Sequence, residues 1–128
     1  MSDKFIVEII SPDKLILRSE TSQVTIPSYE GQMGILKDHI PLITFLRPGI
    51  IHVYDQEKKY YVEEGTIEFS NNNLLILTST AKDIKDLNQS SVEDLLNQAK
   101  NKLSDVNSSD KEKYLLSYKI STLKEINQ

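Results

Sequence analysis

The sequence predicts a protein of two parts, an N-terminal two-sheet β-sandwich followed by a C-terminal antiparallel α-helical hairpin. Before about residue 83 the chain consists of short β-branched segments separated by turn residues, which is typical of sandwiches and barrels. After residue 83 the apolar residues recur at helical spacing. We therefore assign residues 1–82 to the sandwich and residues 83–128 to the hairpin.

Alternation of apolar and polar residues identifies the strands of the first part. In Lys4–Ile10, for example, Phe5, Val7 and Ile9 fall on one face, as in a half-buried strand. We expect Pro27 to close a strand and Ile67 and Phe69 to point inward. The segments expected to be strands are Lys4–Ile10, Leu15–Leu17, Gln23–Ile26, Ile35–Leu36, a strand before Arg47, Ile50–Tyr54, Lys59–Val62, Gly65–Phe69 and Leu74–Thr78.

Turn residues separate these strands. Gly31–Gly34 has the sequence of a loop that needs positive φ at glycine. In the Arg47-Pro48-Gly49 turn, proline presets φ and we expect glycine to take the left-handed position. The polar run Asp55–Lys58 predicts a hairpin. Asn71–Asn73 tolerates left-handed conformations and precedes a strand that we expect to be buried.

Two amphipathic helices are expected in the last third. Ser90 with Glu93, and Ser109 with Glu112, each have the spacing of a capping box. The polar run Ser104–Ser108 separates the two helical patterns, so the helices should form an antiparallel hairpin. The apolar stripes are Val92, Leu95, Leu96, Ala99 and Leu103 on the first helix, and Leu115, Leu116, Ile120, Leu123 and Ile126 on the second.

Composition and motifs give no support to an enzyme. The 128 residues include no cysteine and two histidines, and neither histidine has a metal-ligand spacing. We expect no catalytic residue, no metal and no cofactor. The formal net charge of −4 argues against a nucleic-acid partner. No segment reaches the ~20 apolar residues that span a bilayer, and the N-terminus lacks a leader pattern, so membrane association should come through a protein partner.

The stretch from Ser28 to Val53 is the most informative one. It matches a pattern of fixed spacing, E-G-x-x-G-I-x-x-x-H-x-P-L-x-T-x-L-x-P-G. The matching residues are Glu30, Gly31, Gly34, Ile35, His39, Pro41, Leu42, Thr44, Leu46, Pro48 and Gly49. The segments F-x-V-E-I-I-S-P-D-K at the start and G-T-I-E-F-S-N-N-N-L-L-I-L-T-S-T-A later fit in the same order. The chain thereby resembles the epsilon-subunit family of F-type ATP synthases.

This resemblance implies a non-catalytic rotor subunit that couples the gamma subunit to the c-ring. It implies a c-ring contact at Glu30, Gly31, Gln32, Asp38 and His39, although backbone geometry is the favoured role of Gly31 and Gly34. The candidates for the gamma contact are Ile43, Phe45 and Leu46, with packing in the core as the favoured alternative. The hairpin is expected to reach the alpha and beta subunits transiently and to restrain ATP hydrolysis.

The same resemblance implies a peripheral position on the cytoplasmic side of a bacterial inner membrane, or alternatively on the stromal side of a thylakoid. A stand-alone β-sandwich ligand-binding module with a helical tail is the competing interpretation, and it predicts an exposed aromatic platform.

Two departures from the family pattern have consequences. Lys37-Asp38 stands where the family usually has Pro-Gly, so the turn should be polar and less rigid. Relatives that bind ATP carry Ile/Leu-Asp-x-x-Arg-Ala at the first helix, whereas Leu87–Val92 here has Asn88 for the aspartate and Ser91 for the arginine. The chain has two arginines, Arg18 and Arg47, and neither lies in the hairpin. We therefore expect weak ATP binding or none.

Overall fold

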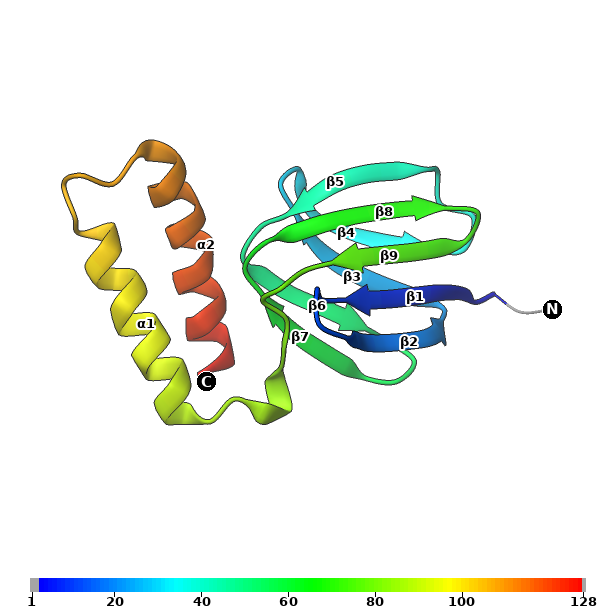
Figure 1. The fold of residues 1–128 in the computed structure, drawn as a ribbon, viewed down its shortest axis with the longest axis horizontal. Coiled ribbons are helices and arrows are strands. Elements are labelled where there is room, and N and C mark those ends of the chain that lie inside the picture. Colours follow the sequence, from blue (N-terminus) through cyan, green and yellow to red (C-terminus); the bar gives the residue numbers. More distant parts are fainter. Residues whose placement is uncertain (1–2, 128) are drawn as a thin grey trace.

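The computed structural model describes residues 3–127 and consists of a β-sandwich with two helices packed against one end (Figure 1). This confirms the predicted fold class. The helices are α1 (Gln89–Leu103) and α2 (Asp110–Ile126), preceded by the short 3-10 helix η1 (Ile84–Asp86). The strands are β1 (Phe5–Ile10), β2 (Leu15–Thr21), β3 (Gln23–Ser28), β4 (Gly31–Leu36), β5 (Leu42–Leu46), β6 (Gly49–Val53), β7 (Lys58–Val62), β8 (Gly65–Ser70), β9 (Asn73–Leu77) and β10 (Lys82–Asp83).

The strands form two layers that are continuous at one corner. The first sheet has the order β5-β8-β9-β1-β2, and the second has the order β4-β3-β6-β7-β10 (Figure 1). Strand β3 turns the corner: Val24 and Thr25 pair with β6, whereas Ser28 pairs with Leu46 of β5. Only β1 and β9 run parallel, and the other pairings among the described residues are antiparallel.

The hydrophobic core of the sandwich is built by the alternation that the sequence predicts. Phe5, Val7 and Ile9 are all buried, and so are Ile67 and Phe69. Phe5 meets Phe69 edge-on, with ring centroids 5.6 Å apart. The last residue that packs against this core is Ala81, so its buried members all precede the helices. The predicted hairpin at residues 55–58 joins β6 and β7, and Asn71 and Asn72 take the predicted left-handed conformation between β8 and β9.

Strand β4 corrects the sequence-based interpretation of its region. Residues 31–34 are not a loop; they pair in register with β3, which runs through Pro27 to Ser28 rather than ending before it. Gly31 has the expected positive φ of 126°, but Gly34 lies in the regular strand. Two glycines suggested a loop, and pairing with β3 overrides that local preference. β4 is an edge strand, because β3 is its sole pairing partner among the described strands.

Gly49 also has a different role from the predicted one. Among the described residues the glycines with positive φ are Gly31 and Gly65, so Gly49 does not take the left-handed position. A Cβ at residue 49 would instead collide with the ring of Pro27. Because β5 pairs with β8 of the first sheet and β6 pairs with β7 of the second, the Arg47–Gly49 turn passes the chain from one sheet to the other. The turn lies close against β3, which pairs with both strands.

The helical hairpin has its own apolar core. The capping box of Ser109 and Glu112 is confirmed, but α1 begins differently from the prediction: its N-cap is Asn88, whose side chain accepts a bond from Ser91 N at 2.7 Å, and not Ser90. Both side chains are good N-caps, so sequence alone could not separate them. The buried residues of this second cluster are Val92, Leu96, Ala99, Ile120 and Leu123, together with Tyr61 of β7.

Candidate interaction surfaces

Among the described residues, the polar side chains of the sandwich do not gather into a candidate reaction site. Within residues 3–127 there is no group of three metal-ligating side chains. The His52 ring stacks on Tyr54, with centroids 3.8 Å apart, and its Nε2 lies 3.3 Å from Glu57 Oε2. The residues that the family resemblance implies lie on the surface of the sandwich, apart from the buried Leu46.

Glu30 lies in the turn between β3 and β4 and is held from inside the sandwich. The Thr44 hydroxyl donates to both carboxylate oxygens, at 2.8 Å to Oε1 and 2.6 Å to Oε2. This bond is the main cause that lowers the pKa of Glu30 below its ordinary value. Ser28 closes the same turn by donating to the carbonyl of Gly31 at 2.7 Å. The neighbouring Gln32 is exposed on β4.

Asp38 and His39 lie in the turn that follows β4. Asp38 has a φ of 67°, and its amide donates to the Asn72 side chain at 2.7 Å while Asn72 donates back to its carboxylate at 3.0 Å. The His39 ring meets Phe69 edge-on, with centroids 5.9 Å apart. This turn is thus tied to the β8–β9 turn, at the end of the sandwich away from the helices (Figure 1).

The five expected c-ring residues are therefore not brought together. Glu30, Gly31 and Gln32 lie at the start of β4, whereas Asp38 and His39 follow its end. A strand of six residues spans about 17 Å, so the two groups lie at opposite ends of the same edge. No single small contact could cover both.

The three candidates for the gamma contact lie on different faces of β5, as the alternation of side chains along a strand requires. Ile43 and Phe45 are 79% and 59% exposed, whereas Leu46 is 1% exposed and lies in the core. Core packing, the alternative that the sequence favoured, therefore describes Leu46 alone among the three. Thr44 lies on the inner face of β5 with Leu46, between the two exposed residues, and its hydroxyl donates to Glu30.

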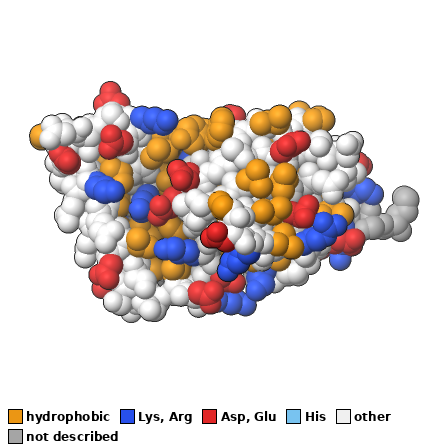
Figure 2. All heavy atoms as spheres, in the orientation of Figure 1, with side chains coloured by type: hydrophobic (Ala, Val, Ile, Leu, Met, Phe, Trp, Pro, Cys, Tyr) orange, Lys and Arg blue, Asp and Glu red, His pale blue; other side chains and the backbone are white. Residues whose placement is uncertain are grey.

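The outer face of the first sheet carries an apolar row that the sequence analysis did not identify. Successive cross-strand partners across four pairings are Phe45, Thr66, Leu77, Ile10 and Leu15. Figure 2 shows hydrophobic side chains gathered over this face among charged ones. The sequence did contain one indication of this row, the run Leu74–Leu77, which is apolar at every position. Because a strand in a two-layer sandwich has one face toward the core and one toward the outside, such a run places apolar side chains on the outer face. Leu77 is accordingly exposed rather than buried as predicted.

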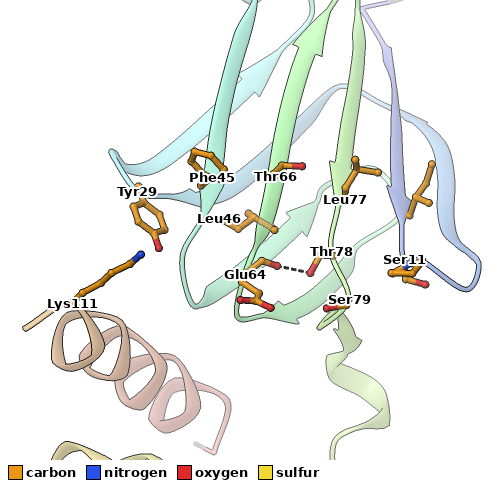
Figure 3. Close-up of a pocket in the computed structure, with 13 residues that line it drawn as sticks. Ser11, Tyr29, Phe45, Leu46, Glu64, Thr66, Leu77, Thr78, Ser79 and Lys111 are labelled. Carbon is orange, nitrogen blue, oxygen red and sulfur yellow. Dashed lines mark hydrogen bonds between the residues drawn. The ribbon is translucent and has the colours of Figure 1, made fainter. Parts of the chain in front are cut away.

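A groove lies at the end of this face that is nearest the helices. Its volume is about 970 Å³, and its lining includes Ile10, Pro12, Phe45 and Leu77. Figure 3 shows Tyr29 and Phe45 on one side of it, and Lys111, which extends from α2 toward Tyr29. The hairpin thus supplies part of the wall.

Few contacts join the hairpin to the sandwich. The guanidinium of Arg47 lies 3.8 Å above the ring of Tyr118 on α2. Glu63 accepts from the Tyr61 hydroxyl at 2.9 Å and pairs with Lys119 at 3.0 Å. Burial is the main cause that raises the pKa of Tyr61, and the neighbouring Glu63 carboxylate adds to it. A polar hollow of about 270 Å³, lined by Tyr118 and Thr122, remains beside this junction.

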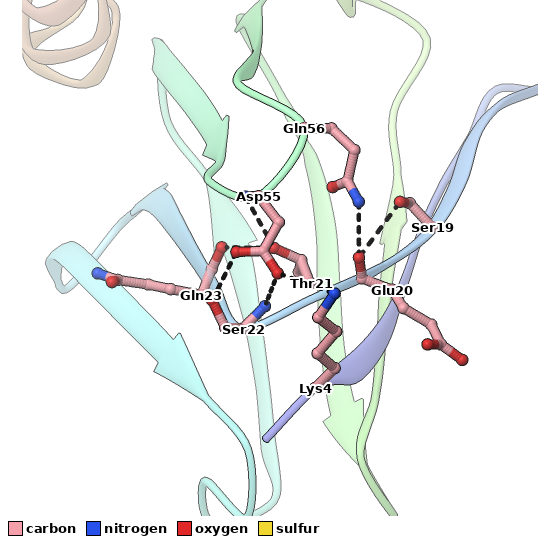
Figure 4. A network of polar contacts seen from close by, with 8 residues as sticks. All are labelled: Lys4, Ser19, Glu20, Thr21, Ser22, Gln23, Asp55 and Gln56. Atoms are coloured by element: carbon pink, nitrogen blue, oxygen red, sulfur yellow. Dashed lines mark hydrogen bonds and ion pairs between the residues drawn. The ribbon is translucent and has the colours of Figure 1, made fainter. Parts of the chain in front are cut away.

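The opposite end of the sandwich is fixed by a polar network (Figure 4). Asp55 accepts from the amide and hydroxyl of Ser22, at 3.1 Å and 2.6 Å, and pairs with Lys4 at 3.6 Å. The Ser22 hydroxyl is the main cause that lowers the pKa of Asp55. This network ties the β6–β7 turn to the β2–β3 turn, so it holds the strand ends in register rather than offering a site.

Comparison with known proteins identifies the family. A family model described as "ATP synthase, Delta/Epsilon chain, beta-sandwich domain" matches residues 4–84. A Pelagibacter ubique protein named ATP synthase epsilon chain is 45% identical, covering 99% of this chain and 100% of the relative. A Rhizobium rhizogenes protein of the same name is 32% identical over 82% of this chain and 80% of its own length.

Solved structures share the fold. A chain of the Euglena gracilis mitochondrial ATP synthase has a TM-score of 0.81 at 20% identity, covering 100% of this chain and 84% of its own. One from the Tetrahymena thermophila central stalk and c-ring has a TM-score of 0.64 at 14% identity, with 96% coverage of both. Within residues 3–127 no helix is long and apolar enough to cross a membrane. The family model and the relatives show that the chain belongs to the ATP synthase epsilon chain family, as a non-catalytic subunit of the enzyme's rotor.

Proposed function

We propose that this subunit holds gamma on the outer face of its first sheet and meets the c-ring along the edge strand β4. The observation that carries the gamma assignment is the exposed apolar row, with Leu77 at its centre and Phe45 at one end. Contiguous apolar surface of this kind is characteristic of docking sites, and permanent interfaces are apolar at their centre. Ile43 extends the same surface by one further position on β5.

The c-ring assignment explains why the two groups of expected contact residues lie at opposite ends of β4. A ring of polar loops that runs along β4 would meet Glu30–Gln32 at one end of the strand and Asp38–His39 at the other. Support comes from the free edge of β4, on which Gln32 is exposed. Because the carboxylate of Glu30 is already hydrogen-bonded inside the molecule, Gln32 is the better placed of the two to reach a partner.

The hairpin is proposed to restrain ATP hydrolysis by leaving the sandwich and contacting the alpha and beta subunits transiently. Its own core is complete apart from Tyr61, and few polar contacts hold it down. An element of this kind can exchange between two positions when their free energies differ by only a few kcal/mol. The bacterial relatives favour the cytoplasmic side of a bacterial inner membrane over the stromal side of a thylakoid.

The gamma face is tested by truncating its exposed apolar side chains. Phe45→Ser and Ile43→Ser should each leave the fold intact, because both side chains are exposed. We expect at least one of them to weaken binding of purified gamma by about 30-fold, the effect of losing an anchoring side chain that contributes about 2 kcal/mol. Titration calorimetry measures this affinity, with Val106→Ser in the helix–helix loop as an exposed apolar control. Unchanged affinity in both sandwich variants would place gamma elsewhere.

Cross-linking in the assembled enzyme tests the c-ring edge. The chain contains no cysteine, so Gln32→Cys and His39→Cys each introduce a unique thiol. Both should form disulfides with cysteines in the c-subunit loops. Lys59→Cys on β7 should not, because β3 and β6 separate it from β4. Cross-linking at only one end of β4 would confine the contact to that end, and failure at both with success at Lys59→Cys would contradict the assignment.

ATP should bind weakly or not at all. Asn88, which stands where ATP-binding relatives have aspartate, is used as the N-cap of α1. The hairpin lysines, such as Lys100 and Lys113, lack the planar fork with which arginine binds phosphate. Losing two charge-assisted contacts should weaken binding at least ~100-fold relative to an ATP-binding relative. Calorimetric titration of the isolated protein with millimolar ATP should therefore show no saturation. A micromolar isotherm would mean that the hairpin builds a nucleotide site from other residues.

A further inference from the structure

The groove beside the apolar row is made by both parts of the molecule. Its floor is apolar and belongs to the sandwich, whereas Lys111 belongs to the first turn of α2 (Figure 3). The groove has this shape only when the hairpin is packed against the sandwich. If the hairpin moved away from the sandwich, the part of the wall that Lys111 supplies would be lost. A partner that fills the groove therefore contacts two elements whose relative position is otherwise held by few bonds.

Two charged side chains that line the groove lack a partner. Among residues 3–127 neither the ammonium group of Lys111 nor the carboxylate of Glu64 takes part in an ion pair or a hydrogen bond, although the backbone of Glu64 is bonded to Thr78 and Thr80. Lys111 also lies at the start of a helix, where the backbone favours negative charge. The matching occupant is a polypeptide segment with apolar side chains in the middle, an acidic side chain facing Lys111 and a basic one facing Glu64.

We infer that such a segment of the gamma subunit fills this groove and thereby holds the hairpin in its folded position. The inference rests on the proposed docking of gamma on the first sheet, with which the groove is continuous through Phe45 and Leu77. A partner that contacts both the sandwich and α2 stabilises the conformation in which the hairpin is packed against the sandwich. By linkage, a folded hairpin strengthens gamma binding by the same factor.

The test measures hairpin opening directly. Thr122 is buried on α2 and lines the hollow at the junction with the sandwich, so Thr122→Cys places one thiol where a reagent arrives only after opening. Its labelling rate is followed by mass spectrometry of this chain, with and without saturating gamma. Val106→Cys, exposed in the helix–helix loop, reports reagent access that does not depend on opening.

Gamma should slow labelling at residue 122 at least about fivefold, the lower end of common couplings between sites. Lys113→Glu, on the same helical turn but outside the groove, should keep this protection. Lys111→Glu should lose it and bind gamma at least about fivefold more weakly. Lys111→Gln, which removes the charge without reversing it, should lose part of the protection. This variant controls for the possibility that the reversed charge in Lys111→Glu itself loosens the hairpin.

Equal protection in Lys111→Glu and Lys113→Glu would overturn the inference while leaving gamma docking intact. So would gamma binding that leaves the labelling rate at residue 122 unchanged in the parent. If gamma bound none of these proteins, the docking face itself would be wrong, and the inference would fall with it.

Discussion

The burial of Tyr61 is the interaction on which the arrangement of the molecule depends. Its strand, β7, belongs to the sandwich, yet its ring is fully buried in the apolar cluster of the hairpin. The sandwich core contains no residue of α1 or α2, and the hairpin cluster contains no other buried sandwich residue among those described. The chain thus has two hydrophobic cores, and one aromatic ring joins them.

The remaining contacts across this junction are modest. A partly exposed cation–π pair such as Arg47–Tyr118 contributes about 0.5–1 kcal/mol, and an ion pair such as Glu63–Lys119 contributes about 0.2–1 kcal/mol. Burial of one aromatic side chain adds about 1.5–3 kcal/mol. The sum is a few kcal/mol, which the differential binding of a partner can supply or overcome. A rigid sandwich for permanent docking and a hairpin that can move are therefore compatible in one short chain.

Local chemistry made most of the elements predictable, and tertiary contacts decided the rest. Alternation identified strands such as Phe5–Ile10, and the left-handed tolerance of asparagine identified the β8–β9 turn. Alternation could not say which face of β5 is inside, because each face carries two apolar residues. Leu42 and Leu46 flank Thr44 on the inner face, and Ile43 and Phe45 lie on the outer one. The close approach of Gly49 to Pro27 and the pairing of β4 depend on residues far along the chain. The family motif named the c-ring candidates, but the length of β4 separates them.

The separation of the two cores is most directly tested by removing the hairpin, at the boundary predicted between residues 82 and 83. A protein ending at Lys82 keeps every buried member of the sandwich core and loses only the second strand residue of β10, Asp83. Circular dichroism with urea titration should show an all-β protein that unfolds in one cooperative transition. A spectrum of an unfolded chain, or a broad transition without cooperativity, would mean that the sandwich needs the hairpin to fold and would contradict the account of two cores.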